Sequence, residues 1–455
     1  MAGAGQSAGA GAAASSGGGS GTDTGAGTGT GDDARPTASS AGDGSPLPLP
    51  TSARSSRFAG LAPFESRAYR FLFVGTALTM TGNFMQMVAQ GWLIYDLTDS
   101  PTWLGIVSFA RGLPMLLLAL VAGVIVDRFD RRIVLITAQG FTALIAVILS
   151  VLIYTEEVQP WHVAVSAFFA GCLFVLIIPA RQALVSSTVP RGLLGPSIAL
   201  MSTGQNSGRV LGPALAGVLI AVVGVAMSFA VQAAGFALAL VCAAMLGPQP
   251  PAAPTRKISA FQSLMEGLRY VWGDSTVLAL TALQAIPAFL IMPYTQLLPI
   301  FTRDILHTGP EGLGLLMMAN GIGSVVGAVI IVMLPVRRQG MFLFTSLASF
   351  GLLLPLFAAS TSLVLSIGIM GLLGAAQAIY LASNTTLVQL ATPDHLRGRV
   401  MSVFMMFFGL MPLGSLPQGI MADIVGAPAV IASTGLLGFL VVVVFTIRAP
   451  AIRRL

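Results

Sequence analysis

Long apolar runs dominate the chain from residue 70 onward. A helix that crosses a bilayer needs about 20 mainly apolar residues, and twelve runs meet that length. They cover residues 70–95, 102–126, 133–154, 160–188, 197–222, 225–246, 277–301, 312–334, 341–359, 363–391, 400–422 and 428–447. The pattern predicts an all-α membrane protein with twelve transmembrane helices.

One long connection, residues 247–276, separates the first six runs from the last six. It opens with clustered prolines and continues as ISAFQSLMEGLRYVW, which is apolar at helical spacing and predicts an amphipathic helix at the membrane surface. We therefore expect a six-helix half over 58–246, a linker over 247–276 and a second six-helix half over 277–455. The repeat of LVSSTVPRGLLG (184–195) as LVQLATPDHLRG (387–398) supports two related halves.

Residues 1–57 have another composition, dominated by Gly, Ala, Ser and Thr. Such a segment cannot bury enough apolar surface to offset its ordering entropy, which predicts a disordered tail. It has no basic stretch followed by an apolar one, so it does not read as a signal peptide.

The distribution of charged residues predicts which ends of the spans face the cytoplasm. Only 9% of residues are charged although the net charge is +6, and the basic residues lie in short connections rather than in a stripe that would favour nucleic acid. Apart from Arg303, they fall on the side of the termini, whereas acids gather on the other side. Basic connections stay in the cytoplasm, so we expect a cell-membrane protein with both termini cytoplasmic.

The connection after the second run reads GVIVDRFDRR. This G-x-x-x-D-R-x-x-R-R pattern resembles the signature loop of the major facilitator superfamily. The resemblance implies a gate in which the loop meets the start of span eleven. Its residues are Gly123, Asp127, Arg128, Arg131, Arg132, Gly398 and Arg399. The alternative, a plain basic stop loop, needs neither the glycine nor the first aspartate.

Other stretches narrow the resemblance. The fifth run carries small residues at helical spacing and resembles the antiporter motif of facilitator exporters, with Ala216 in place of one glycine; its residues are Gly204, Gly208, Gly212, Pro213 and Gly217. Close helix packing alone also explains this spacing. PARQALVSSTVP (179–190), NSGRVLGPALAG (206–217) and SNTTLVQLATPDHLRGRV (383–400) resemble the branch that includes enterobactin and macrolide exporters, the transmembrane secretion effectors.

This resemblance implies secondary active export of a small amphiphilic molecule, such as a drug, a siderophore or another metabolite, by alternating access. The alternatives are a lipid or lysolipid flippase of the same fold and a non-transporting scaffold. The expected partners are a small-molecule substrate and the lipid bilayer. Proton coupling is usual in the resembling exporters, but the spans offer no acid away from their ends, so the coupling ion stays open.

Polar side chains inside the runs are the candidates for a substrate cavity, because charges and amides facing lipid are costly. Three arginines would suit an anionic or hydroxylated cargo, or could bond within the bundle. The candidates are Asn83, Gln86, Gln90, Arg111, Arg181, Arg209, Gln284, Tyr294, Gln377, Tyr380 and Asn384. Hydrogen bonds between neighbouring helices are the alternative role.

Enzymatic chemistry is not indicated. The chain has no Walker A pattern and no nucleophile elbow. Its two cysteines lie inside apolar runs, and its three histidines are far apart. We expect no catalytic residue, no cofactor and no metal.

Overall fold

The computed structural model describes residues 59–248, 260–333 and 338–448. The expected tail over 1–57, the proline-rich start of the linker and the side chain of Asp127 lie outside the described residues.

Twelve helices are long and apolar enough to cross a membrane, which confirms the predicted number of spans. The first half holds η1 (Ala59–Glu65), α1 (Arg67–Thr98), α2 (Pro101–Arg128), α3 (Arg131–Tyr154), α4 (Pro160–Thr188), η2 (Arg191–Leu193), α5 (Leu194–Val223) and α6 (Val225–Ala244). The second half holds α7 (Ala260–Gly273), α8 (Ser275–Leu290), η3 (Met292–Leu297), α9 (Leu298–Ile300), η4 (Phe301–Ile305), α10 (Pro310–Met333), α11 (Gln339–Ala358), α12 (Leu363–Ala391), α13 (Asp394–Met406), η6 (Phe407–Gly409), α14 (Leu410–Val425) and α15 (Ala427–Arg448).

Capping residues and glycines set several helix ends. Ser66 accepts a hydrogen bond from the backbone of Tyr69 at the start of α1, and the carboxylate of Asp274 accepts two at the start of α8. Gly224 and Gly426 have φ values of 88° and 85°, a left-handed conformation that glycine adopts without strain. They join α5 to α6 and α14 to α15, so the same sharp turn occurs at the same place in both halves.

The connection between the second and third spans is shorter than the sequence pattern suggests. Gly123 and Arg128 still belong to α2, and α3 begins at Arg131. Phe129 and Asp130 alone make the turn, which is possible because the Asp130 carboxylate caps α3 by accepting from the Arg132 backbone at 2.8 Å.

Spans seven and eleven are interrupted. Span seven runs from α8 through a 3₁₀ turn and a π turn. Pro293 and Pro299 lie in this irregular part, and each lacks the N–H that an α-helix needs. Span eleven changes to a 3₁₀ turn at Phe407–Gly409 before α14. The sequence predicted an uninterrupted helix in both places.

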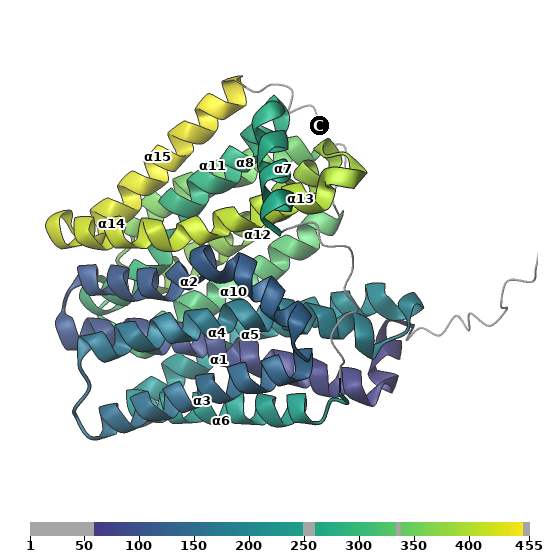
Figure 1. Cartoon of the computed structure of the whole chain (residues 1–455). Helices are drawn as coiled ribbons and strands as arrows, with labels where there is room; N and C mark the ends of the chain where they lie inside the picture. The colour runs from purple at the N-terminus through teal and green to yellow at the C-terminus, as the bar shows by residue number, and fades with distance from the viewer. Residues whose placement is uncertain (1–58, 249–259, 334–337, 449–455) are drawn as a thin grey trace, which may run out of the picture. The chain divides into compact units, whose positions relative to one another are not determined.

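Within the first half, α1 packs on α5 and α6, α2 on α4, and α3 on α6; within the second, α10 packs on α12 and α11 on α12 and α15. In Figure 1 the first half (purple to teal) occupies the lower part of the view, and α8 and α11 to α15 occupy the upper part. The halves meet through two helix pairs, α2 with α14 and α5 with α10. We call the end of the bundle where α1 begins and α15 finishes the termini end, and the other the opposite end.

Glycines let these two pairs approach closely. A Cβ on Gly217 of α5 would lie 2.9 Å from the Cα of Gly314 in α10, and a Cβ on Gly419 of α14 would lie 3.2 Å from the Cα of Gly105 in α2. Each half thus contributes a glycine to both crossings, which lie near the opposite end.

Candidate functional site

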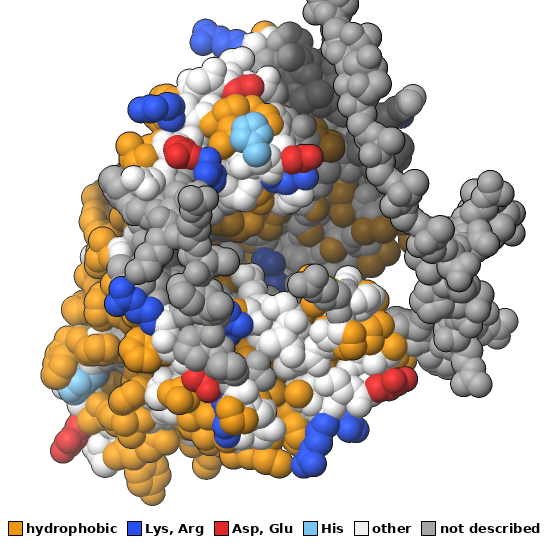
Figure 2. All heavy atoms as spheres, turned by 45° about the vertical axis from the view of Figure 1, so that its right-hand side comes forward, with side chains coloured by type: hydrophobic (Ala, Val, Ile, Leu, Met, Phe, Trp, Pro, Cys, Tyr) orange, Lys and Arg blue, Asp and Glu red, His pale blue; other side chains and the backbone are white. Residues whose placement is uncertain are grey.

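A hollow separates the two halves when the molecule is seen from the side of Figure 2. The view brings the right-hand side of Figure 1 forward, and a basic side chain is visible inside the hollow. Polar contacts near mid-span join side chains of α1 and α2 and side chains of α5 and α12.

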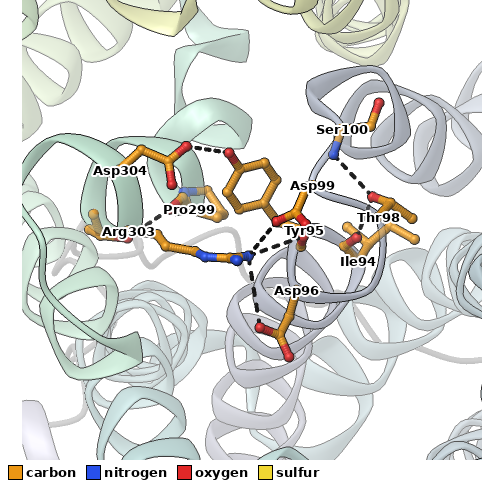
Figure 3. Close-up of polar contacts among 10 residues, drawn as sticks. Ile94, Tyr95, Asp96, Thr98, Asp99, Ser100, Pro299, Arg303 and Asp304 are labelled. Atoms are coloured by element: carbon orange, nitrogen blue, oxygen red, sulfur yellow. Dashed lines mark hydrogen bonds and ion pairs between the residues drawn. The ribbon is translucent and has the colours of Figure 1, made fainter.

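At the opposite end, a charged cluster joins α1 to span seven. Arg303 lies 2.9 Å from a carboxylate oxygen of Asp99 and 3.8 Å from one of Asp96, and the hydroxyl of Tyr95 donates to Asp304 (Figure 3). The guanidinium also lies over the Tyr95 ring, 5.4 Å from its centroid. We call these five residues the Arg303 cluster.

A second link lies at the same end. The Asp423 carboxylate of α14 accepts hydrogen bonds from the Ser100 hydroxyl at 3.2 Å and from the Thr102 backbone at 3.0 Å, and also from the Thr102 hydroxyl. Sequence reasoning used these acids and Arg303 only as topology signals. Opposite charges at the same ends of spans one and seven were the signal that could have identified the contact.

In the first half, Arg111 organises a polar group. Its Nη2 lies 2.5 Å from Oδ1 of Asn83, and its Nη1 lies 3.2 Å from Oε1 of Gln90. The Gln90 amide in turn donates to the Ser166 hydroxyl at 3.1 Å. The structure thus brings together three predicted cavity residues, and adds Ser166 of α4.

Arg209 connects the halves near the middle of the membrane. Its Nη2 donates to Oε1 of Gln377 in α12 at 2.9 Å. Both side chains are half-buried. A charge at mid-bilayer costs at least about 2.5 kcal/mol on insertion scales, so a polar neighbour across the interface offsets part of that cost.

The polar group of the second half is closed to solvent. The hydroxyl of Tyr380 donates to Oε1 of Gln284 at 2.8 Å, and the Asn384 amide donates to the Leu280 carbonyl at 3.2 Å. All three side chains are 0% exposed. Tyr294 is also buried, with Asn320 donating to its hydroxyl at 3.2 Å. In this conformation these residues hold α12 and α10 against span seven.

Two other cavity candidates lie inside the first half. Gln86 is 1% exposed, and its amide nitrogen has no partner among the described residues. Arg181 is 5% exposed and lines, with Thr79 and Gln139, a small cavity enclosed by α1, α3, α4 and α6. The structure therefore places Arg181 away from the space between the halves.

The gate residues at the termini end are spread out. A Cβ on Gly123 or Gly398 would meet nothing within 4 Å, and Arg128 is exposed. Arg132 of α3 donates to the carbonyl of Ala244 at 2.6 Å. Arg131 begins α3.

Arg399 forms an ion pair with Glu266 of the linker helix α7. Gly267 allows this contact, since a Cβ there would lie 2.7 Å from the Arg399 carbonyl oxygen. Met265 and Trp272 are exposed on α7.

The antiporter-like residues serve two contacts. Gly204, Gly208 and Gly212 face α1: a Cβ on Gly208 would lie 2.6 Å from the backbone nitrogen of Thr81. Gly217, one turn past Pro213, faces α10 of the other half instead. The same run therefore packs α5 within its half and across the interface.

Comparisons with known proteins agree with this architecture. A family model described as "transmembrane secretion effector" matches residues 58–454. The chain is 27% identical to the staphyloferrin A transporter of Staphylococcus aureus, over 83% of this chain and 95% of that protein. It is 28% identical to the multidrug efflux pump Tap of Mycolicibacterium fortuitum, over 84% and 96%. A crystal structure of a variant of the nucleoside transporter NupG matches with a TM-score of 0.69 at 11% identity, over 84% of this chain and 100% of that one.

Proposed function

The chain belongs to the transmembrane secretion effector family of major facilitator transporters, and from this premise we propose that it exports a small amphiphilic molecule by alternating access. It is a multi-pass membrane transporter rather than an enzyme. The names of the relatives support a drug or a siderophore as cargo. The charge bias of the connections supports cytoplasmic termini in the cell membrane.

One observation carries the proposal: the halves touch towards the opposite end, whereas a hollow lies between them on the side that Figure 2 brings forward. Among the described glycines, the close approaches between α2 and α14 run from Gly419 against Pro101 to Gly409 against Leu116. Those between α5 and α10 run from Gly217 to Gly321 against Arg209. These contacts extend from the opposite end to mid-span, as expected of a transporter open at the termini end. With cytoplasmic termini, this is the inward-open state.

The gate that the major facilitator signature loop implies would then close in the outward-open state. We propose that Asp127 meets the start of span eleven, near Gly398 and Arg399, when the cytoplasmic side closes. The room beside Gly123 and Gly398 supports this role, because a gate that closes later must leave space while it is open. The Glu266 ion pair occupies Arg399 in the inward-open state.

A substitution tests the gate. Asp127→Asn removes the charge that would favour a helix N-terminus, a contact of about 0.3–1 kcal/mol, so transport should fall while the amount of folded protein stays the same. Glu65→Gln, which neutralises an exposed acid just before α1 at the same end, is the matched control and should transport normally. Wild-type transport by Asp127→Asn would show that the charge of Asp127 has no role in the gate.

Export is tested with purified protein in proteoliposomes and a panel of siderophores and drugs, with and without a pH gradient. At least one compound should cross faster than in protein-free vesicles. Fluorescent lysolipid added to the same vesicles examines the flippase alternative. Lysolipid translocation without movement of any panel compound would replace export with lipid flipping.

A further inference from the structure

Two arginines near the interface of the halves have only neutral partners. Among the described residues, neither Arg111 nor Arg209 has a carboxylate within ion-pair distance. Their acceptors are amide oxygens of Asn83, Gln90 and Gln377 and one backbone carbonyl. A guanidinium gains more from a carboxylate than from an amide, because opposite charges attract and a carboxylate can accept two parallel N–H bonds.

The two arginines differ in how firmly they are held. Arg111 is bound on two nitrogens by α1 of its own half. Within the part of the chain that the structure describes, Arg209 donates one side-chain hydrogen bond, and its partner, Gln377, lies in the other half. Among the described residues, Arg181 has buried nitrogens without a partner and Arg209 has none, and the side chain of Arg209 is half-buried rather than fully buried.

We propose that the cavity takes a cargo with an anionic oxygen group, a carboxylate in the simplest case, which binds Arg209 in place of Gln377. The planar guanidinium can hold both oxygens of a carboxylate, which a single amide oxygen cannot match. This inference rests on the proposed export function and names its substrate class.

Replacing Gln377 by an anion as the partner of Arg209 removes a contact between the two halves. The bond from Arg209 to Gln377 joins α5 of one half to α12 of the other near mid-span. An anion on Arg209 releases Gln377 and removes that bond. The anion therefore binds best to conformations in which the halves have separated here, and it shifts the population towards them.

The test uses two probes of one shape: 1-naphthylacetate, a carboxylate, and 1-naphthylacetamide, its neutral amide. Binding to the full-length protein in lipid nanodiscs is measured by calorimetry. The distance between spin labels on α5 and α12 at the termini end reports the conformation. We expect the acid to bind at least about tenfold more tightly than the amide and to be the one that changes the distance.

Variants separate a binding role from a structural one. Arg209→Gln should weaken the acid at least about tenfold and leave the amide unchanged, while Arg209→Lys should retain part of the preference. Gln377→Ala should tighten acid binding, because it removes the competitor, and should change the label distance without any ligand. Asn206→Ala, exposed on the same helix, is the control and should behave as wild type.

Equal binding of acid and amide, or weaker acid binding by Gln377→Ala, would overturn the inference. These outcomes are distinct from a failure of export. Carboxylate binding and transport at the wild-type level in Arg209→Gln would leave export standing and remove the anion site. Arg209-dependent acid binding without transport of any compound would keep the anion site and remove the proposed export.

Discussion

Tyr380 and Asn384 reach from α12 to span seven and end on Gln284 and on backbone carbonyls, with no exposed surface. The polar residues of span one, Asn83 and Gln90, instead surround a half-buried arginine, Arg111. The two halves therefore use similar amide groups differently, since one set fixes a helix contact and the other orients a charge.

Asn384→Ala should lower the thermal stability of the protein in detergent by a few degrees. Hydrogen bonds between membrane helices average about 0.6 kcal/mol, and the loss also leaves the Leu280 carbonyl without this donor. Any remaining transport should keep its original Km. Asn206→Ala serves as the control, and a changed Km at unchanged stability would make Asn384 a cargo contact.

Helical spacing predicted which polar residues share a face, but not what that face meets. Gln377, Tyr380 and Asn384 lie on one side of α12, yet Gln377 contacts α5 while the other two contact α8. Partners of this kind come from chain segments about 100 or more residues away, and no local pattern encodes them. The Arg303 cluster was missed for the same reason.

At the scale of helices, glycine crossings define where the halves touch. Gly217 meets Gly314, and Gly105 meets Gly419, in two pairs that are related by the internal repeat. Both crossings lie between the mid-span contacts and the opposite end, so they set how closely the halves approach each other there.

Gly217→Ala should weaken the inward-open state. The new Cβ would lie 2.8 Å from the Pro310 carbonyl oxygen, which forces α5 and α10 apart at the closed end. Spin-label distances across the opposite end should lengthen. Gly235→Ala, where a Cβ meets nothing within 4 Å, is the control and should be neutral or stabilising. Unchanged label distances in Gly217→Ala would show that α5 and α10 can accommodate a methyl group at this crossing without moving apart, and would contradict the prediction.

Hydropathy predicted the number and order of spans because length and apolar content are local properties. It could not predict the interruptions of spans seven and eleven. Prolines within an apolar run are compatible with both straight and broken helices, and neighbouring helices decide between them.

At the scale of the whole molecule, charge divides the two ends of the bundle. The Arg303 cluster and Asp423 bring acids together at the opposite end, whereas Arg128, Arg131, Arg132 and Arg399 lie towards the termini end. This asymmetry underlies the proposed orientation.

Cysteine labelling tests that orientation. With Cys172 and Cys242 replaced, an impermeant maleimide added to intact cells should label a cysteine at Thr308 and miss one at Ser259. Labelling of both sites after membrane permeabilisation controls for reactivity. Labelling of the Ser259 position in intact cells would show that the linker faces the outside. The termini end would then face the outside as well, and the open state would be outward-open.

If Arg209 binds an anionic cargo, transport moves charge across the membrane and depends on the membrane potential. An anion that leaves Arg209 for the outside carries negative charge out of a cell whose interior is negative, and each such charge gains about 2.3 kcal/mol per 100 mV. Valinomycin-imposed potassium potentials in proteoliposomes should speed the flux of a carboxylate cargo in one direction and slow it in the other, while a neutral analogue is unaffected. Membrane voltage itself would then be a source of energy for export.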